Sequence, residues 1–202
     1  MMWCISPVIA DRAPMTMDYM RSTATSNDYF AAADNGAGYL NPGMLEYQWN
    51  SNLRPISNLP SGLSVWQEHC EKYYKKWGLT LTCFIIDGYA EGMKKRELDC
   101  YQAFSPNGIV WQKGAISYLH NNMPVLRNDW DINDKDPAEA AKKAVSRINE
   151  RPIPFHWFRN ILKSPSWYVQ VNENMKKINP KIELLDAPTF FELYRIYLKN
   201  NP

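Results

Sequence analysis

The segment Thr80-Leu81-Thr82-Cys83-Phe84-Ile85-Ile86-Asp87-Gly88 decides how this chain is expected to fold. An almost uninterrupted apolar run of this length, closed by Asp-Gly, is typical of a β-strand that is covered on both faces. The preceding segment, 62–77, carries Trp66, Cys70, Tyr73, Tyr74 and Trp77 at helical spacing, which gives one apolar stripe. We therefore expect a strand inside a sheet and a helix packed on that sheet.

The same alternation of strand and helix patterns continues in both directions along the chain. Strands are predicted at Trp3–Ser6, Tyr29–Ala33, Thr80–Asp87, Gly108–Gln112, Pro124–Arg127, Ile153–Phe158 and Ile182–Leu185. Helices are predicted at 12–23, 62–77, 92–104, 137–149, 165–178 and 188–199, with a short one near 115–121. Strands that alternate with helices indicate parallel pairing through crossover helices.

Several helix ends carry recognisable capping signals. Asp136-Pro137 and Ser164-Pro165 each place a capping oxygen before a proline at the first helical position, and Pro188 marks a third start. Gly78 follows the helix 62–77 and fits a left-handed C-terminal cap. These signals fix the order of the elements more firmly than their exact bounds.

The predicted fold class is α/β, built of alternating strand-helix units with a mainly parallel sheet. A doubly wound open sheet and an incomplete or irregular TIM-barrel-like fold both fit this pattern. About seven strands fall short of the eight units of a complete barrel of about 250 residues. The first strand pattern begins at once, at Trp3, so we expect residues 1–202 to be one barrel-like domain that is a fragment of a longer protein or starts late in its reading frame.

Composition and charge argue against several classes of partner. A formal net charge of +2, without a Lys/Arg block, gives no reason to expect a nucleic acid. The sequence contains no run of about 18 apolar residues, so membrane insertion is not expected. Met1–Ala10 does not look like a signal peptide. Cys4, Cys70, Cys83 and Cys100 include no pair with C-x-x-C spacing, and three of the four lie in apolar patterns, so we expect buried free thiols.

The most distinctive segment is Gly36-Ala37-Gly38-Tyr39-Leu40-Asn41-Pro42, which follows the predicted strand Tyr29–Ala33. Its glycines permit positive φ angles or a close approach to a ligand. Tyr39 would then project from the C-terminal end of a strand, where α/β barrels hold their active sites. A tight turn with a locally packed tyrosine explains the pattern equally well. The dinucleotide-binding motif G-x-G-x-x-G requires a third glycine, but Asn41 stands at that position, so this kind of loop is excluded.

This segment resembles the signature of the GxGYxYP putative glycoside hydrolase family. Similar pieces occur at Trp3–Pro7, Ala24–Phe30 and Phe190–Leu193, so the resemblance covers nearly the whole chain as that family's C-terminal domain. It implies a carbohydrate ligand, no cofactor, a secreted or periplasmic location, and further N-terminal domains that are missing from this chain. One position departs from the signature, because Asn41 stands where the motif has its second tyrosine.

Acidic residues follow several predicted strands and are the candidates for catalysis. Asp87 is the first choice, because an apolar strand delivers it and Gly88 leaves room beside it; Asp34 and Asp129 are next. Each of the three could instead cap a helix or brace a loop. Hydrolysis of a glycosidic bond requires two carboxyl groups, one protonated and one ionised. In a parallel fold the ends of the strands converge, so these acids would share one site.

Residues around the acids are expected to bind substrate. These are Asn35, Gly36, Gly38, Tyr39, Glu91, Arg127, Trp130 and Arg159. Trp130, with Trp111 and Trp157, could stack on sugar rings, although core packing is the commoner role for Trp157.

Other chemistries find no support in the sequence. The three histidines are scattered, no group of residues has metal-ligand spacing, and no G-x-S-x-G elbow or P-loop occurs. The leading hypothesis is a hydrolase that acts on a glycan or polysaccharide. The alternatives are a noncatalytic carbohydrate-binding or degenerate barrel fragment and, third, a scaffold for an attached domain.

Overall fold

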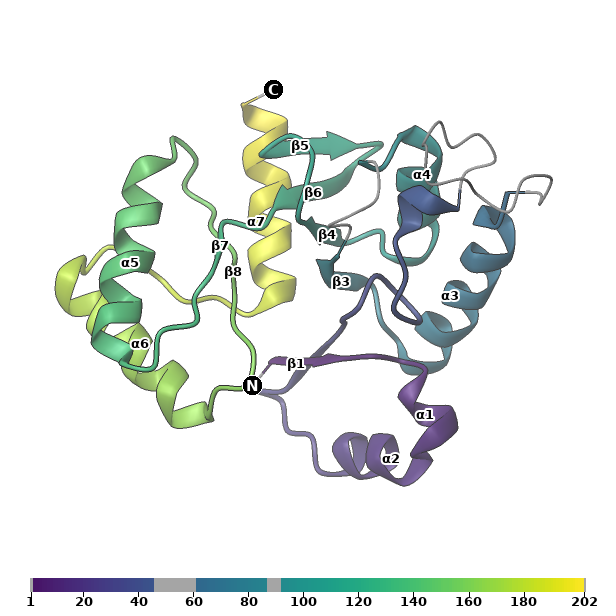
Figure 1. The fold of residues 1–202 in the computed structure, drawn as a ribbon, viewed down its shortest axis with the longest axis horizontal. Helices are drawn as coiled ribbons and strands as arrows, with labels where there is room; N and C mark the ends of the chain where they lie inside the picture. The colour runs from purple at the N-terminus through teal and green to yellow at the C-terminus, as the bar shows by residue number, and fades with distance from the viewer. Residues whose placement is uncertain (1, 46–60, 87–91, 202) are drawn as a thin grey trace. The chain divides into compact units, whose positions relative to one another are not determined.

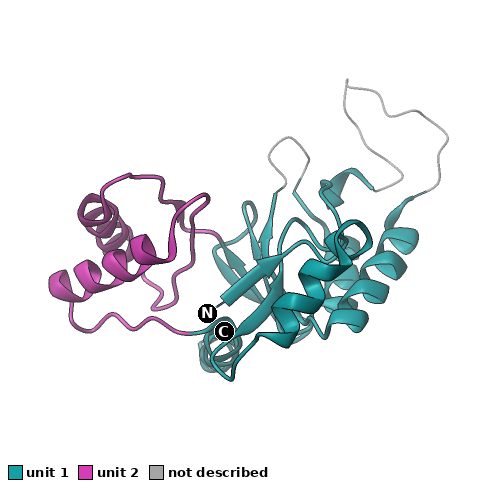
Figure 2. Ribbon diagram, turned by 90° about the horizontal axis from the view of Figure 1, so that it is seen from below, with its two compact units in different colours: residues 1–127, 186–202 teal, residues 128–185 magenta. Residues whose placement is uncertain are grey.

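A computed structural model describes residues 2–45, 61–86 and 92–201 (Figure 1). The chain divides into two compact units, drawn in different colours in Figure 2. Unit 1 comprises residues 1–127 and 186–202, and unit 2 comprises residues 128–185. The expectation of one domain over residues 1–202 stays a prediction.

A mainly parallel sheet forms the centre of unit 1, as predicted. Six strands in the described part of the chain pair in the order β1-β2-β3-β4-β6-β5. Their bounds are β1 Met2–Ile5, β2 Tyr29–Ala32, β3 Leu81–Ile85, β4 Gly108–Trp111, β5 Ser117–His120 and β6 Met123–Arg127. All neighbouring pairs are parallel except β5 and β6. Since β1 and β5 end the sheet, it is open in the described residues, and the barrel-like alternative is not confirmed.

Helices cover both faces of this sheet (Figure 1). The helices of unit 1 are α1 Ile9–Arg12, α2 Pro14–Ser22, α3 Leu63–Trp77, α4 Lys95–Phe104 and α7 Ala187–Asn200. Side chains of α3 and α4 share one apolar cluster with Ile85, Ile109 and Val125. On the other face, the α7 residue Tyr194 donates a hydrogen bond to the backbone oxygen of Val125 at 3.2 Å. The apolar stripe of segment 62–77 therefore packs on the sheet as predicted.

A β-bulge interrupts β3 close to its C-terminal end. Thr82 pairs with Ile109 and Ile85 pairs with Trp111, so β3 uses three steps where β4 uses two. Thr82 faces the helices, where its hydroxyl lies 2.7 Å from that of Tyr74. Because one residue is inserted, Ile85 returns to that same helix-covered face. The bulge therefore sets the direction in which the chain leaves the strand at Ile86.

The segment predicted as a short helix at 115–121 is a strand instead. Asn121 and Asn122 both have positive φ angles, of 46° and 79°, and connect β5 to β6 as a two-residue hairpin turn. Asparagine tolerates this conformation, and such turns match the twist of paired strands. The hairpin signal therefore outweighs the weak helical spacing.

Unit 2 contains two packed helices and a short parallel pair of strands. Its elements are β7 Trp130–Asp131, α5 Pro137–Glu150, β8 Phe158–Arg159 and α6 Pro165–Ile178. Ala140, Ala144, Trp167 and Val171 form the helix interface. The predicted caps are confirmed here, because Asp136 and Ser164 accept hydrogen bonds from the first turns of α5 and α6.

Two strand predictions were wrong in this region. Only Phe158 of the predicted strand Ile153–Phe158 pairs with another strand, because Pro152 and Pro154 lack the N–H groups that a ladder needs. Residues 182–185 form no strand. Leu184 is instead 73% exposed, and Ile182 donates to Asn179 in a turn.

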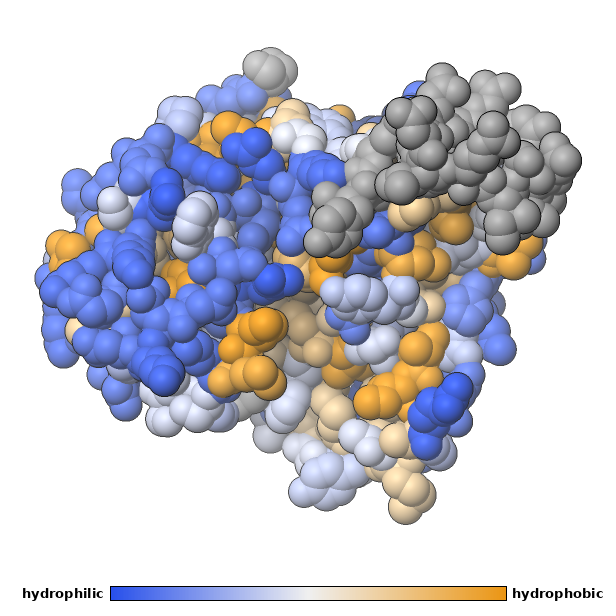
Figure 3. Space-filling model, in the orientation of Figure 1, coloured by the Kyte–Doolittle hydropathy of each residue, from blue (hydrophilic) through white to orange (hydrophobic). Residues whose placement is uncertain are grey.

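The surface of unit 1 carries separate hydrophobic patches on the face drawn in Figure 3, whereas unit 2 is largely hydrophilic there. Exposed apolar residues of unit 1 include Met15, Tyr19 and Val65. Cys70, Cys83 and Cys100 are buried free thiols, as predicted, and Cys4 is an exposed one. No helix among the described residues is long and apolar enough to cross a membrane.

Close packing of α7 on β4 makes a first prediction about stability. Gly108 has φ +147°, and an added Cβ would lie 2.3 Å from Phe191 Cδ1, so Gly108→Ala must displace the ring. Gly78 has φ +62° with no atom near its Cβ position, so Gly78→Ala adds only backbone strain of about 1–2 kcal/mol. In urea unfolding we expect Gly108→Ala to cost about 1–3 kcal/mol more than this control. Equal losses would contradict the packing of Phe191 on β4.

Candidate functional site

The chain turns sharply where β2 ends. Asp34, Asn35 and Gly36 have consecutive positive φ angles of 57°, 67° and 124°. Asparagine and aspartate visit this region at a cost of about 1–2 kcal/mol each, and such strain persists only where other contacts fix it. The turn leaves Asp34 half-buried and Asn35 fully buried.

Asn35 supplies the contacts that fix the turn. Its side-chain oxygen accepts a hydrogen bond from the Ile86 backbone N–H at 2.7 Å, and its side-chain nitrogen donates to the Ile86 oxygen at 2.6 Å. The same nitrogen donates to the Leu40 oxygen, and the Asn35 N–H donates to Phe84 O at 3.1 Å. The Asn35 carbonyl accepts from the Tyr101 hydroxyl at 2.7 Å. We call this set of bonds the Asn35 clamp.

The clamp corrects one sequence expectation. Asn35 was expected to bind substrate, but it is 0% exposed and its amide is committed to backbone groups. Its role is to hold the motif loop, 36–42, against the end of β3. Gly36 also faces inward, because an added Cβ would lie 3.0 Å from Cys70 Sγ. It permits close packing on α3 and is buried away from any ligand.

The rest of the motif loop rests on α3. The Ala37 N–H donates to Cys70 Sγ at 3.3 Å, and His69 Nε2 lies 3.0 Å from the Ala37 oxygen. Gly38 has open space around its Cβ position, and Tyr39 is 70% exposed. These two residues are therefore accessible, and their expected role in substrate binding stays a prediction.

Asp34 is the candidate acid that lies in the turn after β2. Burial raises the pKa of its carboxyl group above the usual value, because the ionised form loses water. Asp87 follows Ile86, the residue that the clamp holds, but Asp87 and Glu91 lie outside the described residues.

Asp129, the third acid, has a structural environment inside unit 2. Its side chain is 0% exposed and lies 2.6 Å from Arg151 Nη1 and 3.4 Å from His156 Nδ1. It also accepts a hydrogen bond from the Trp157 backbone N–H at 2.6 Å. A carboxylate with these partners anchors the loop 151–157, which does not fit the catalytic role expected for it.

The remaining predicted residues have mixed surroundings. Trp130 is 48% exposed, but the Arg147 guanidinium covers one face of its ring at 4.2 Å. Arg159 pairs with Asp131 through two nitrogens. Arg127 is half-buried at the end of β6. Trp111 is only 3% exposed, so the expected stacking surface does not include it.

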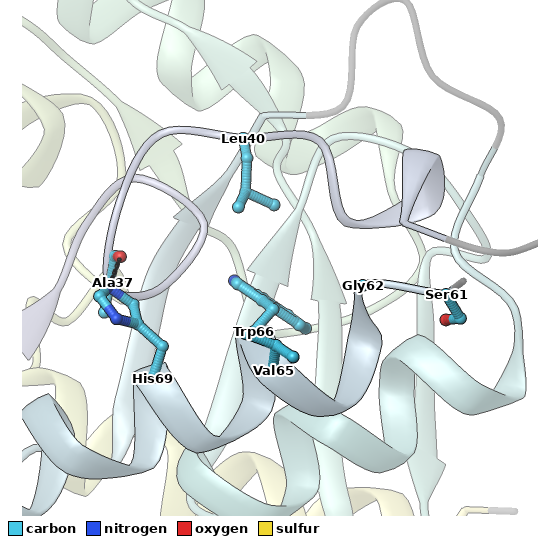
Figure 4. A pocket seen from close by; sticks show the side chains of 7 residues that line it. All are labelled: Ala37, Leu40, Ser61, Gly62, Val65, Trp66 and His69. Carbon is cyan, nitrogen blue, oxygen red and sulfur yellow. Dashed lines mark hydrogen bonds between the residues drawn. The ribbon is translucent and has the colours of Figure 1, made fainter. Parts of the chain in front are cut away.

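An open pocket of about 520 Å³ lies under the motif loop (Figure 4). It is lined by Ala37, Leu40, Ser61, Gly62, Val65, Trp66 and His69. Sequence reasoning placed Trp66 in the core stripe and gave His69 no role. Their spacing of three residues, on one side of a helix, is the signal that could have linked them. Among the described residues, no cluster of His, Cys, Asp and Glu could hold a metal ion.

Comparison with known proteins identifies the family. Residues 1–195 match the model of the GxGYxYP putative glycoside hydrolase C-terminal domain. The chain belongs to this family. The segment that resembles the GxGYxYP signature is the motif loop, which the Asn35 clamp holds through its bond to Leu40.

A solved structure supports the fold of this GxGYxYP domain. The crystal structure of a putative hydrolase from Bacteroides thetaiotaomicron VPI-5482 matches with a TM-score of 0.71 at 17% sequence identity. The match covers 98% of the present chain and 39% of that chain. At this identity the likeness shows the fold alone. No curated protein matches the chain.

The Asn35 clamp makes a second prediction. Asn35→Asp keeps the shape of the side chain but replaces a donor with a carboxylate oxygen that faces the carbonyls of Leu40 and Ile86. We expect a loss of about 2–4 kcal/mol in unfolding free energy at pH 7. The matched control is Asn41→Asp, in the same loop but half-exposed, for which we expect about 1 kcal/mol or less. Similar losses for the two variants would argue against the clamp.

Proposed function

We propose that this GxGYxYP domain takes part in glycoside hydrolysis, with Asp34 as the general acid and Asp87 as the second carboxyl group. The Asn35 clamp is the observation that carries this proposal. Asn35 and Ile86 are the two residues that the clamp joins. Asp34 comes directly before Asn35 in the sequence, and Asp87 comes directly after Ile86, so the Cα atom of each acid is one peptide unit, about 3.8 Å, from that of a clamp residue. Both acids are therefore sequence neighbours of residues that the clamp joins, which supports a shared site.

The surroundings of Asp34 support its role as the acid. A general acid must keep its proton near the pH at which the enzyme works, and burial raises the pKa of Asp34. Asp87 would then act in its ionised form, as a nucleophile or as a base for water. A carboxyl separation of about 5–5.5 Å would give retention of stereochemistry, and one of about 6.5–9.5 Å would give inversion.

The substrate we propose is a glycan or polysaccharide. The exposed ring of Tyr39, five residues after Asp34 in the sequence, offers a flat surface for a sugar. The family name and the hydrolase title of the solved structure support the reaction class. Because the chain spans 39% of that structure, the activity of a longer protein would draw on further domains.

A noncatalytic carbohydrate-binding domain is the second candidate. Two observations favour it: Asn41 replaces the second tyrosine of the signature, and Asp129 is committed to structural partners. In that case Tyr39 would still bind sugars, and Asp34 would only shape the turn.

Hydrolysis of a glycan panel at several pH values separates these candidates. We expect Asp34→Asn and Asp87→Asn each to reduce kcat at least about 100-fold, the usual contribution of a positioned acid or base. Activity of the unsubstituted chain should fall as the pH rises through the raised pKa of Asp34, because the acid then loses its proton. Asp18→Asn, at an exposed position of α2, is the matched control and should retain full activity. Unchanged activity in both test variants would exclude these two acids.

A further inference from the structure

The pocket under the motif loop contains a buried hydrogen-bond donor without an acceptor. Trp66 is 5% exposed, and its indole N–H is buried with no partner. Its ring is held edge-on against Tyr101 and Phe104, at centroid distances of 5.1 and 5.3 Å. Burying an N–H without an acceptor is costly, and few such groups remain in folded proteins. Because Trp66 also lines the pocket, a ligand bound there with an acceptor group could satisfy this donor.

His69 contributes the complementary group. The Ala37 carbonyl can only accept a hydrogen bond, so the His69 Nε2 atom, 3.0 Å away, must carry the hydrogen. In the neutral ring, Nδ1 is then an acceptor. Figure 4 shows His69 beside Ala37 at one end of the pocket, and Trp66 in the middle below Leu40. Trp66 and His69 thus both line the pocket, three residues apart on α3.

The rest of the wall is apolar. Leu40 forms the roof, and Val65 lies on the helix below it (Figure 4). The hydroxyl of Ser61, at the far end of the pocket, already donates its hydrogen to the Leu45 oxygen at 3.1 Å, so it is not available as a donor to a ligand. A sugar with only hydroxyl groups would leave several of them against carbon atoms. A substituent with a methyl group, a carbonyl and an N–H offers a partner to each part of the wall: the apolar side chains, the Trp66 donor and the His69 acceptor.

We propose that this pocket binds the acetamido group of an N-acetylated sugar. The acetyl carbonyl accepts from Trp66 Nε1, the amide N–H donates to His69 Nδ1, and the methyl group packs against Leu40 and Val65. This inference rests on the proposed function and narrows its substrate class to glycans with N-acetylhexosamine residues. The Asn35 clamp links the two sites, because one side-chain nitrogen bonds both Leu40 in the pocket roof and Ile86 before Asp87.

Titration calorimetry with two trisaccharides tests the inference on the full chain. Triacetylchitotriose and cellotriose differ only in their acetamido groups, and we expect the first to bind at least about tenfold more tightly, the worth of one hydrogen bond. Trp66→Phe keeps an aromatic ring but removes the donor, and should abolish this preference. Trp77→Phe is the matched control, because Trp77 also has a buried, unpartnered N–H on α3 but does not line the pocket. Equal binding of the two sugars, or a preference that survives in Trp66→Phe, would overturn the proposal.

A second pair of variants covers the case in which Trp66→Phe does not fold. Val65 is 70% exposed, so Val65→Trp fills the pocket from the helix surface without disturbing the core. It should abolish binding of triacetylchitotriose, whereas Ser64→Trp, at the exposed neighbouring position, should not. Full binding in Val65→Trp would contradict the assigned site.

The results also separate this inference from the proposed function. Hydrolysis that depends on Asp34, together with equal binding of both trisaccharides, would overturn the acetamido pocket and leave the hydrolase intact. A preference for the acetylated sugar that Trp66→Phe abolishes, without hydrolysis of any glycan, would support the pocket and overturn the catalytic role of Asp34 and Asp87.

Discussion

The side-chain amide of Asn35 is the constraint on which the functional end of this fold depends. The amide bonds both the N–H and the carbonyl of Ile86, directly after the end of β3. It thus makes the hydrogen bonds that a neighbouring strand would otherwise make to that residue. A third bond, to Leu40, closes the motif loop over α3. Without this amide, three backbone groups would be left unsatisfied in a half-buried position, and the strained turn at Asp34 would have little to hold it.

The surrounding structure is arranged to support this one contact. The bulge in β3 changes the direction of the strand shortly before Ile86, and Gly36 lets the loop approach Cys70 on α3. Tyr101, on α4, reaches through the core to the carbonyl of Asn35. Helices on one face of the sheet thereby hold a loop at the C-terminal ends of the strands. Parallel α/β folds carry their ligand sites at these strand ends. The candidate acid Asp34 and the pocket of Trp66 are two consequences of the same arrangement.

Sequence reasoning predicted the sheet well because its signals are local. The apolar run around Phe84, the helical stripe from Trp66 to Trp77 and the capped helix starts each depend on neighbouring residues. The open edges of the sheet and the strandless segment 182–185 depend on which strands find partners far away in sequence, which no local pattern reports. The same limit applies to the site: spacing identified the loop but could not show that Asn35 points inward or that Asp129 is tied to Arg151.

Amide hydrogen exchange at Ile86, followed by NMR, tests the central claim most directly. Ile86 lies beyond the last residue of β3, so only its bond to Asn35 Oδ1 can protect its N–H. If the clamp exists, this amide exchanges as slowly as that of Ile109 in the middle of the sheet, through near-global unfolding. Exchange at the rate of an exposed loop amide would mean that Asn35 does not hold the end of β3, and the shared origin proposed for the acid pair and the pocket would fail.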